Sequence, residues 1–104
     1  MCLYENSLQE IIYRKGHEVG YINAFQHKNG IYEIEYGVHE EYRNKGIMKK
    51  QFKKFIKKNK QIKKAVLLIH QDNIPSQKVA INAGFFEIKF LKDKDVLKYL
   101  FYRK

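Results

Sequence analysis

Apolar and polar residues alternate in the first third of the chain in a pattern that predicts β-strands. Residues 8–14 and 17–25 are rich in β-favouring side chains, and the Lys-Gly pair at 15–16 suits a tight turn between them. A second turn signal at 28–30 leads into residues 31–38, where apolar positions alternate with glutamates and a glycine. The pattern predicts a hairpin followed by a third strand with one apolar and one polar face.

The spacing of apolar residues changes to a helical period near residue 47. From about 47 to 59 the apolar residues share one stripe and lysines cover the remaining surface. Residues 65–69 are a purely apolar run, too short to span a bilayer and typical of a buried strand. Pro75 and Gly84 mark the first turn and the end of a second helix. The stripe consists of Met48, Phe52, Phe55 and Ile56.

Two further strands are predicted at the end of the chain. Residues 86–91 alternate between apolar and polar, residues 92–95 turn, and residues 96–102 supply the last strand. The 104 residues, 44% of them hydrophobic, suffice for one core. We therefore expect a single compact α/β domain over 1–104 with the order β-β-β-α-β-α-β-β.

Charge limits the classes of partner. The chain has 21 Lys and Arg against 11 Asp and Glu, and a net charge of +10 attracts nucleic acid, acidic membranes or a phosphate-bearing cofactor. The segment 49–64 holds nine lysines, which would suit a nucleic-acid backbone. These lysines flank an intact apolar stripe, however, which favours a solvated helix face over a nucleic-acid-binding surface.

Cysteine and histidine usage bears on compartment and metals. Cys2 is the one cysteine and cannot form an internal disulfide, and no segment resembles a secretion signal, so a cytoplasmic protein without a membrane association is expected. The four histidines show no metal-ligand spacing, and no metal site is expected.

The segment 38–48 has the features of a phosphate-binding loop. A strand ends, a polar loop follows, and Gly46 stands where a helix begins, so backbone N–H groups converge at a positive helix end. Gly46 lacks the Cβ that would block close approach, and positive charge around it comes from Arg43, Lys45, Lys49 and Lys50. Taken alone, an ordinary strand-to-helix connection explains this segment equally well.

The segment 73–85 also follows a strand and opens a helix. Asn73 and Ser76 would lie near the N-terminus of that helix, where polar residues usually act as caps. Two strands that are each followed by a helix N-terminus indicate a ligand crevice at the carboxyl ends of the strands.

Together the two segments resemble motifs A and B of the GNAT-type N-acetyltransferase superfamily, over roughly residues 8–102. Residues 43–48 are similar to Arg/Gln-x-x-Gly-x-Gly/Ala, and Asn73, Ser76 and the Gly-Phe pair at 84–85 are similar to motif B. The resemblance implies a mixed, mostly antiparallel sheet with a central parallel, splayed strand pair and two main helices. It also implies that this chain lacks the usual N-terminal strand and two helices.

The resemblance further implies that acetyl-coenzyme A enters between strands 31–38 and 65–70. In the family, loop amides hold the pyrophosphate, the amide that ends the preceding strand polarises the acetyl carbonyl, and the motif B residues lie beside the cofactor. The cofactor-binding residues implied in this chain are Val38, Arg43, Asn44, Lys45, Gly46, Ile47, Met48, Asn73 and Ser76.

This sequence departs from the family pattern in three places. Met48 replaces the second small residue of motif A, and Ala80 stands where many relatives place a proton-donating tyrosine. The missing front end usually walls the acceptor pocket, so either the acceptor site is open or a second subunit closes it. We expect a homodimer, with a monomer as the alternative.

Acetyl transfer to an amine needs a base and a donor for the leaving thiolate. Candidate bases are Glu33, Glu35 and His70, although a strand glutamate can also simply face solvent. The resulting hypothesis is an N-acetyltransferase that uses acetyl-coenzyme A and an amine of unknown identity. The alternatives are a non-catalytic coenzyme A-binding module and a basic nucleic-acid-binding module. Candidate donors are Tyr36, Tyr42 and Tyr99.

Overall fold

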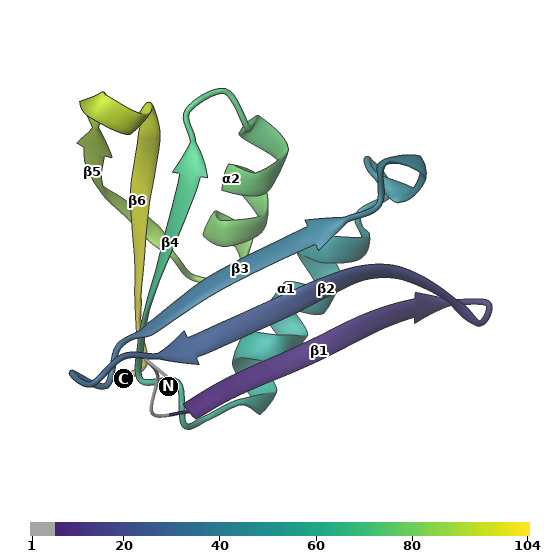
Figure 1. The fold of residues 1–104 in the computed structure, drawn as a ribbon, viewed down its shortest axis with the longest axis horizontal. Helices are drawn as coiled ribbons and strands as arrows, with labels where there is room; N and C mark the ends of the chain where they lie inside the picture. The colour runs from purple at the N-terminus through teal and green to yellow at the C-terminus, as the bar shows by residue number, and fades with distance from the viewer. Residues whose placement is uncertain (1–5) are drawn as a thin grey trace.

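The computed structural model describes residues 6–104 and has the predicted order of strands and helices (Figure 1). Short 3-10 turns occupy Glu40–Tyr42, in the loop before the first helix, and Lys92–Lys94, where the sequence predicted a turn. The strands are β1 (Asn6–Arg14), β2 (His17–Gln26), β3 (Tyr32–Val38), β4 (Lys64–His70), β5 (Phe86–Leu91) and β6 (Val96–Tyr102), and the helices are α1 (Ile47–Lys58) and α2 (Ile74–Asn82).

The six strands form one sheet in the order β1-β2-β3-β4-β6-β5. Every neighbouring pair is antiparallel except β3 and β4, which are parallel. The β3–β4 pairing within the described chain is confined to Tyr32 with Ala65 and Glu33 with Val66, after which the strands diverge (Figure 1). The predicted fold class, a mostly antiparallel sheet with a central splayed parallel pair and two helices, is confirmed.

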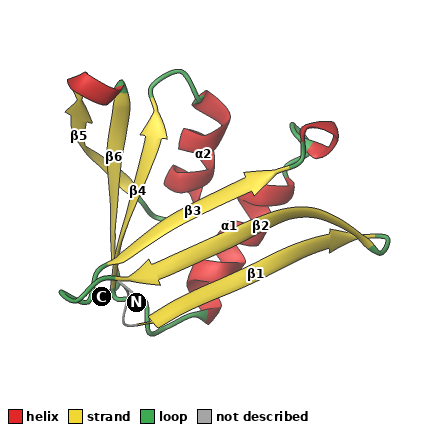
Figure 2. Ribbon diagram, viewed as in Figure 1, coloured by secondary structure: helices red, strands yellow, loops and turns green. Residues whose placement is uncertain are grey.

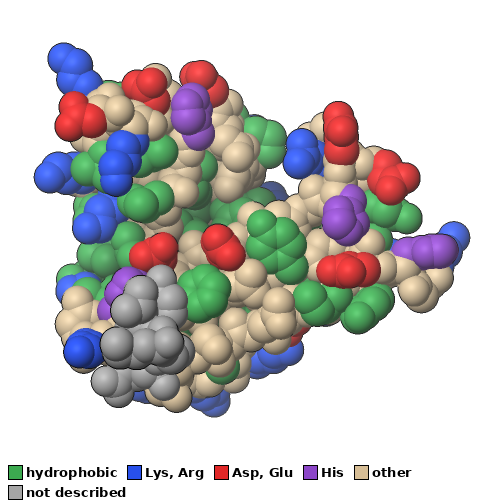
Figure 3. Space-filling model, in the orientation of Figure 1, with side chains coloured by type: hydrophobic (Ala, Val, Ile, Leu, Met, Phe, Trp, Pro, Cys, Tyr) green, Lys and Arg blue, Asp and Glu red, His purple; other side chains and the backbone are tan. Residues whose placement is uncertain are grey.

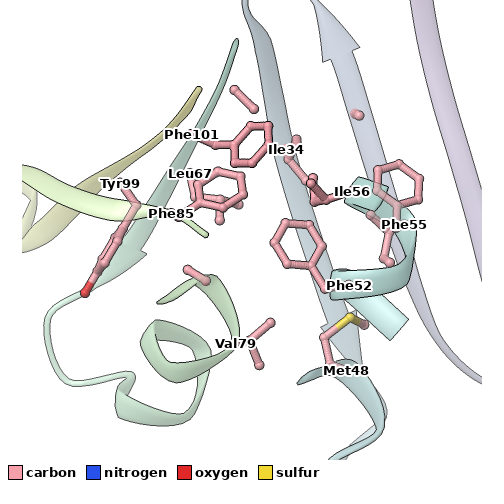
Figure 4. Close-up of a cluster of buried hydrophobic side chains, with 14 of the residues drawn as sticks. Ile34, Met48, Phe52, Phe55, Ile56, Leu67, Val79, Phe85, Tyr99 and Phe101 are labelled. Carbon is pink, nitrogen blue, oxygen red and sulfur yellow. The ribbon is translucent and has the colours of Figure 1, made fainter. Parts of the chain in front are cut away.

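Both helices pack on the same face of the sheet (Figure 2). The predicted stripe of α1 is confirmed, because its four members are all buried. The ring of Phe52 lies 5.6 Å from that of Phe85, in the segment after α2 (Figure 4). It also lies 4.8 Å from the ring of Tyr36, so it joins α1 to β3 as well. Burying one such side chain stabilises the fold by about 1.5–3 kcal/mol.

The strand β5 is exposed on both of its faces, unlike the other strands. Its alternation is present, but Phe86, Ile88 and Phe90 are 47%, 46% and 42% exposed. The reason is tertiary: β5 is an edge strand that pairs with β6 alone, and its register shifts between Glu87 and Lys89. Alternation in the sequence therefore identified the strand but not a buried face.

Neither helix of the described chain is long and apolar enough to cross a membrane.

Candidate functional site

A cleft of about 640 Å³ opens where β3 has diverged from β4. Its walls are the end of β3, the loop that follows, the first turn of α1 and the first turns of α2. All nine residues that the sequence motifs single out for the cofactor line this one cleft. They are Val38, Arg43, Asn44, Lys45, Gly46, Ile47, Met48, Asn73 and Ser76.

The loop before α1 takes its shape from two left-handed backbone positions, Asn44 (φ 63°) and Gly46 (φ 72°). Gly46 is the N-cap of α1, and it has no side chain that could accept a hydrogen bond from the first turn. A Cβ placed at Gly46 would meet no atom within 4 Å, so the space beside it is open. The first-turn amides of α1, which have no intrahelical acceptor, are therefore available to an anion.

The charged side chains that line the cleft in the described chain are all basic. Arg43, Lys45, Lys49 and Lys78 line it, and no Asp, Glu or His of the described chain does. The Arg43 guanidinium also donates from Nε to the Val38 carbonyl at 3.1 Å, which fastens the loop to the end of β3. Basic side chains around open helix amides form a site for phosphate oxygens.

The start of α2 differs from that of α1 because a side chain caps it. The Asn73 Oδ1 atom accepts a hydrogen bond from the Ser76 backbone N–H at 3.2 Å. The capping role that the sequence left open for Asn73 is thus present, and Asn73 still lines the cleft.

The Tyr36 hydroxyl lies between two atoms of Ser76. It donates to the Ser76 carbonyl at 2.8 Å and accepts from the Ser76 Oγ at 2.9 Å. Burial raises the pKa of Tyr36 to about 12, although the hydrogen bond from Ser76 partly opposes this shift. The phenol is therefore protonated at neutral pH, and both residues line the cleft.

The other two candidate donors have different surroundings. Tyr42 lines the cleft, with the Lys45 ammonium 5.8 Å from the centre of its ring. Tyr99 is buried outside the cleft and donates to the Gln77 Oε1 at 3.3 Å. Burial raises the pKa of the Tyr99 hydroxyl. Ala80, at the position of the family tyrosine, is fully buried in the core and does not line the cleft.

The structure does not bring the three candidate bases to the cleft. Glu33 and Glu35 alternate with the inward-facing residues of β3, so they lie on the sheet face that carries no helix. The Glu35 carboxylate accepts from Asn23 at 3.1 Å, and that of Glu33 lies 3.1 Å from the His27 Nε2. His70 is exposed, and its Nδ1 accepts from the Asp72 N–H at 3.2 Å. Their catalytic roles stay predictions.

Sequence reasoning missed several cleft residues. Gly37, Pro75, Lys78 and Val79 also line the cleft, whereas Lys49, which lines it too, was among the charges that the sequence placed around Gly46. Lys78 follows the N-terminus of α2 by a few positions, and helical spacing would have placed it near that terminus.

Among residues 6–104, no group of three or more His, Cys, Asp and Glu side chains could hold a metal ion. Cys2, noted in the sequence, lies outside the described residues.

The chain shows clear similarity to one protein family. The model of the acetyltransferase (GNAT) domain matches residues 4–86. A search of curated protein sequences finds no significant match.

Solved structures share the fold at low sequence identity. The ribosomal L7/L12 alpha-N-protein acetyltransferase RimL, in complex with coenzyme A, aligns with a TM-score of 0.83 and 18% identity over 92% of this chain and 62% of its own. The microcin C7 self-immunity acetyltransferase MccE, in complex with acetyl-CoA and AMP, has a TM-score of 0.82 and 20% identity over 95% and 62%.

The aminoglycoside acetyltransferase AAC(6')-Ib, in complex with ribostamycin and coenzyme A, aligns with a TM-score of 0.76 and 14% identity, covering 95% of this chain and 65% of its own. The chain thus spans just under two thirds of each of these three structures. The family model covers most of the sequence and the fold agrees with it, so the chain belongs to the GNAT acetyltransferase family.

Proposed function

We propose that this chain binds acetyl-coenzyme A in the cleft and transfers the acetyl group to an amine. The observation that carries the proposal is the meeting of nine motif residues around an uncapped helix N-terminus with basic side chains. The coenzyme A and acetyl-CoA complexes of RimL, MccE and AAC(6')-Ib support it, since these proteins share the fold.

The two halves of the cleft suit the two halves of the cofactor. The open amides after Gly46, with Arg43 and Lys45, match the pyrophosphate, and Lys49 and Lys78 offer charge for a further phosphate. The uncharged part, around Tyr36 and Ser76, matches the pantetheine arm.

The reaction forms a C–N bond to the acetyl carbon and breaks the C–S bond, so a thiolate leaves and the attacking nitrogen loses a proton. We assign the donor role to Tyr36, whose one phenolic proton turns from the Ser76 carbonyl, its acceptor in the structure, to the leaving sulfur. Because its pKa is about 12, well above about 8.5 for an ordinary thiol, it stabilises the thiolate by a hydrogen bond and keeps its own proton.

No acidic or histidine side chain of the described chain lines the cleft, so we propose that water receives the proton of the amine. The acceptor is an amine whose identity the cleft leaves open.

A non-catalytic coenzyme A-binding module is the second candidate. It is favoured by Ala80 being buried where relatives carry a tyrosine and by the fact that none of Glu33, Glu35 and His70 lines the cleft. A nucleic-acid-binding module rests on the lysines of residues 49–64 alone, six of which lie on α1. Release of free thiol from acetyl-coenzyme A with a panel of amines separates catalysis from binding.

Binding itself is tested by calorimetry with Gly46→Asp and its matched control Gly30→Asp. Both glycines have left-handed φ angles (72° and 86°), and a Cβ at either meets nothing within 4 Å, so the backbone strain of the two variants is comparable. We expect Gly46→Asp to lose binding, because its carboxylate repels the pyrophosphate, and Gly30→Asp to keep it. Absence of binding by the unmodified chain at millimolar acetyl-coenzyme A would overturn the proposal.

A further inference from the structure

The sheet has one face without helices in the described chain, opposite α1 and α2 (Figure 2). This helix-free face carries the outward-pointing side chains of all six strands. We infer that it is a homodimer interface, on which a second copy of this chain packs sheet against sheet.

Large apolar side chains gather on the helix-free face without burial. Leu68 on β4 is 48% exposed, and Phe86 and Ile88 on β5 and Tyr102 on β6 are 47%, 46% and 52% exposed. The rings of Phe86 and Tyr102 stack with centroids 6.3 Å apart. Single exposed apolar residues are ordinary, whereas a contiguous group marks an interaction surface.

The face is also hollowed. A groove of about 490 Å³ lies across β4, β6 and β5, with Val66, Ile88, Leu100 and Tyr102 in its lining. Hydrophobic side chains surround this part of the molecule, and acidic side chains lie beside them (Figure 3). A depression with an apolar lining accepts the apolar side chains of a facing sheet.

Charge selects a second copy as the partner. The whole chain carries +10, and α1 exposes six lysines on the other side of the molecule, where an acidic protein or nucleic acid would be drawn. The helix-free face is nearly balanced: its carboxylates are Glu18 on β2 and Glu33 and Glu35 on β3, and its lysines are Lys64, Lys89 and Lys98 on β4, β5 and β6.

The arrangement of these charges allows two identical copies to face each other with opposite charges in contact. The carboxylates lie on β2 and β3, and the lysines lie on the strands from β4 to β5. A two-fold rotation between facing sheets lays the β3 of one copy over the lysine-bearing strands of the other. Each copy then contributes both signs, as an isologous interface requires.

The outline of the molecule leaves room for an interface of standard size. The molecule measures 38 by 31 Å across the view of Figure 1, which looks onto this face. A standard interface needs about 800 Å² from each partner. Sheets that pack face to face at about −30° meet over such an area.

Sedimentation velocity over a concentration series, without acetyl-coenzyme A, tests the inference independently of the proposed function. We expect a dimer whose dissociation constant rises at least about tenfold in Leu68→Asp. The matched control is Ile81→Asp on α2, which replaces a similarly exposed side chain (58%) away from the face and should leave the dimer intact. Circular dichroism and thermal melting confirm that both variants fold.

Charge-reversed pairs test the complementarity itself. The variant with Glu33→Lys and Glu35→Lys, and the variant with Lys64→Glu and Lys98→Glu, should each be monomeric alone and form a heterodimer when mixed. A chain that is monomeric up to millimolar concentration overturns the inference. A dimer that resists Leu68→Asp, or a mixture that stays monomeric, also overturns it.

Discussion

The hydroxyl of Tyr36 joins β3 to α2 through both polar atoms of Ser76, a residue 40 positions further along the chain. The contact crosses the molecule where β3 and β4 have no backbone pairing, so side chains hold the cleft walls together there. The same phenol is the protonated donor that the proposed reaction needs. Stability and activity are therefore linked at this residue.

Tyr36→Phe tests that link. The variant keeps the ring beside Phe52 and loses both hydrogen bonds to Ser76, so we expect a loss of unfolding free energy of about 1 kcal/mol. If the hydroxyl stabilises the thiolate, kcat falls at least about tenfold while KM for acetyl-coenzyme A changes little. Tyr99→Phe is the control, since it removes one hydrogen bond outside the cleft. Equal kcat values for the two variants would contradict the role of Tyr36.

The raised pKa of Tyr36 predicts a stability difference that depends on pH. The folded phenol has a pKa of about 12 and the unfolded one of about 10, so between these values the unfolded chain binds fewer protons and the free energy of unfolding falls as pH rises. The contribution is fully present below pH 10. We expect the stability advantage of the unmodified chain over Tyr36→Phe, measured by urea denaturation, to shrink as the pH rises from about 10 towards about 12. A constant difference would contradict the shift.

Charge reversal distinguishes the lysines of the cleft from those of the α1 surface. We expect Lys49→Glu with Lys78→Glu to weaken acetyl-coenzyme A binding at least about tenfold, most strongly at low salt, because both side chains line the cleft. Lys54→Glu with Lys57→Glu makes the same change in charge roughly 12 Å and 16 Å further along the helix axis from Gly46, where the effect is screened. Calorimetry at two salt concentrations measures both. Equal losses in the two pairs would show that only net charge matters.

Arg103 is predicted to stabilise the end of α1. Its guanidinium donates to the carbonyls of Ile62 (2.9 Å), Asn59 (3.4 Å) and Ile56. We expect Arg103→Met to lower the free energy of unfolding by about 1–3 kcal/mol, because partly buried carbonyls lose their donor.

The comparison for Arg103 is Lys58→Met, which breaks the ion pair with Glu10. That lysine side chain is 63% exposed, so its loss should cost less than about 1 kcal/mol. Denaturation curves rank the two variants, and a larger effect of Lys58→Met would contradict the assignment to Arg103.

The sequence by itself determined the local elements. The order of strands and helices, the buried stripe of α1 and the loop around Gly46 follow from periodicity, turn residues and helix-end signals. Each of these signals depends on residues close together in the sequence, so it can be interpreted without knowledge of the rest of the chain. The family motifs then linked two loops that periodicity alone would have left separate.

Only the tertiary structure decided which residues share the cleft. Neighbouring residues of a strand point to opposite faces of the sheet, so only one of Glu35 and Tyr36 can face the cleft. Which of them does so depends on the side of the sheet on which α1 packs after its crossover from β3. The exposure of β5 depends on its being an edge strand, and the contact of Tyr36 with Ser76 depends on the divergence of β3 and β4. These are relations between segments distant in the chain, and local residue patterns do not encode them.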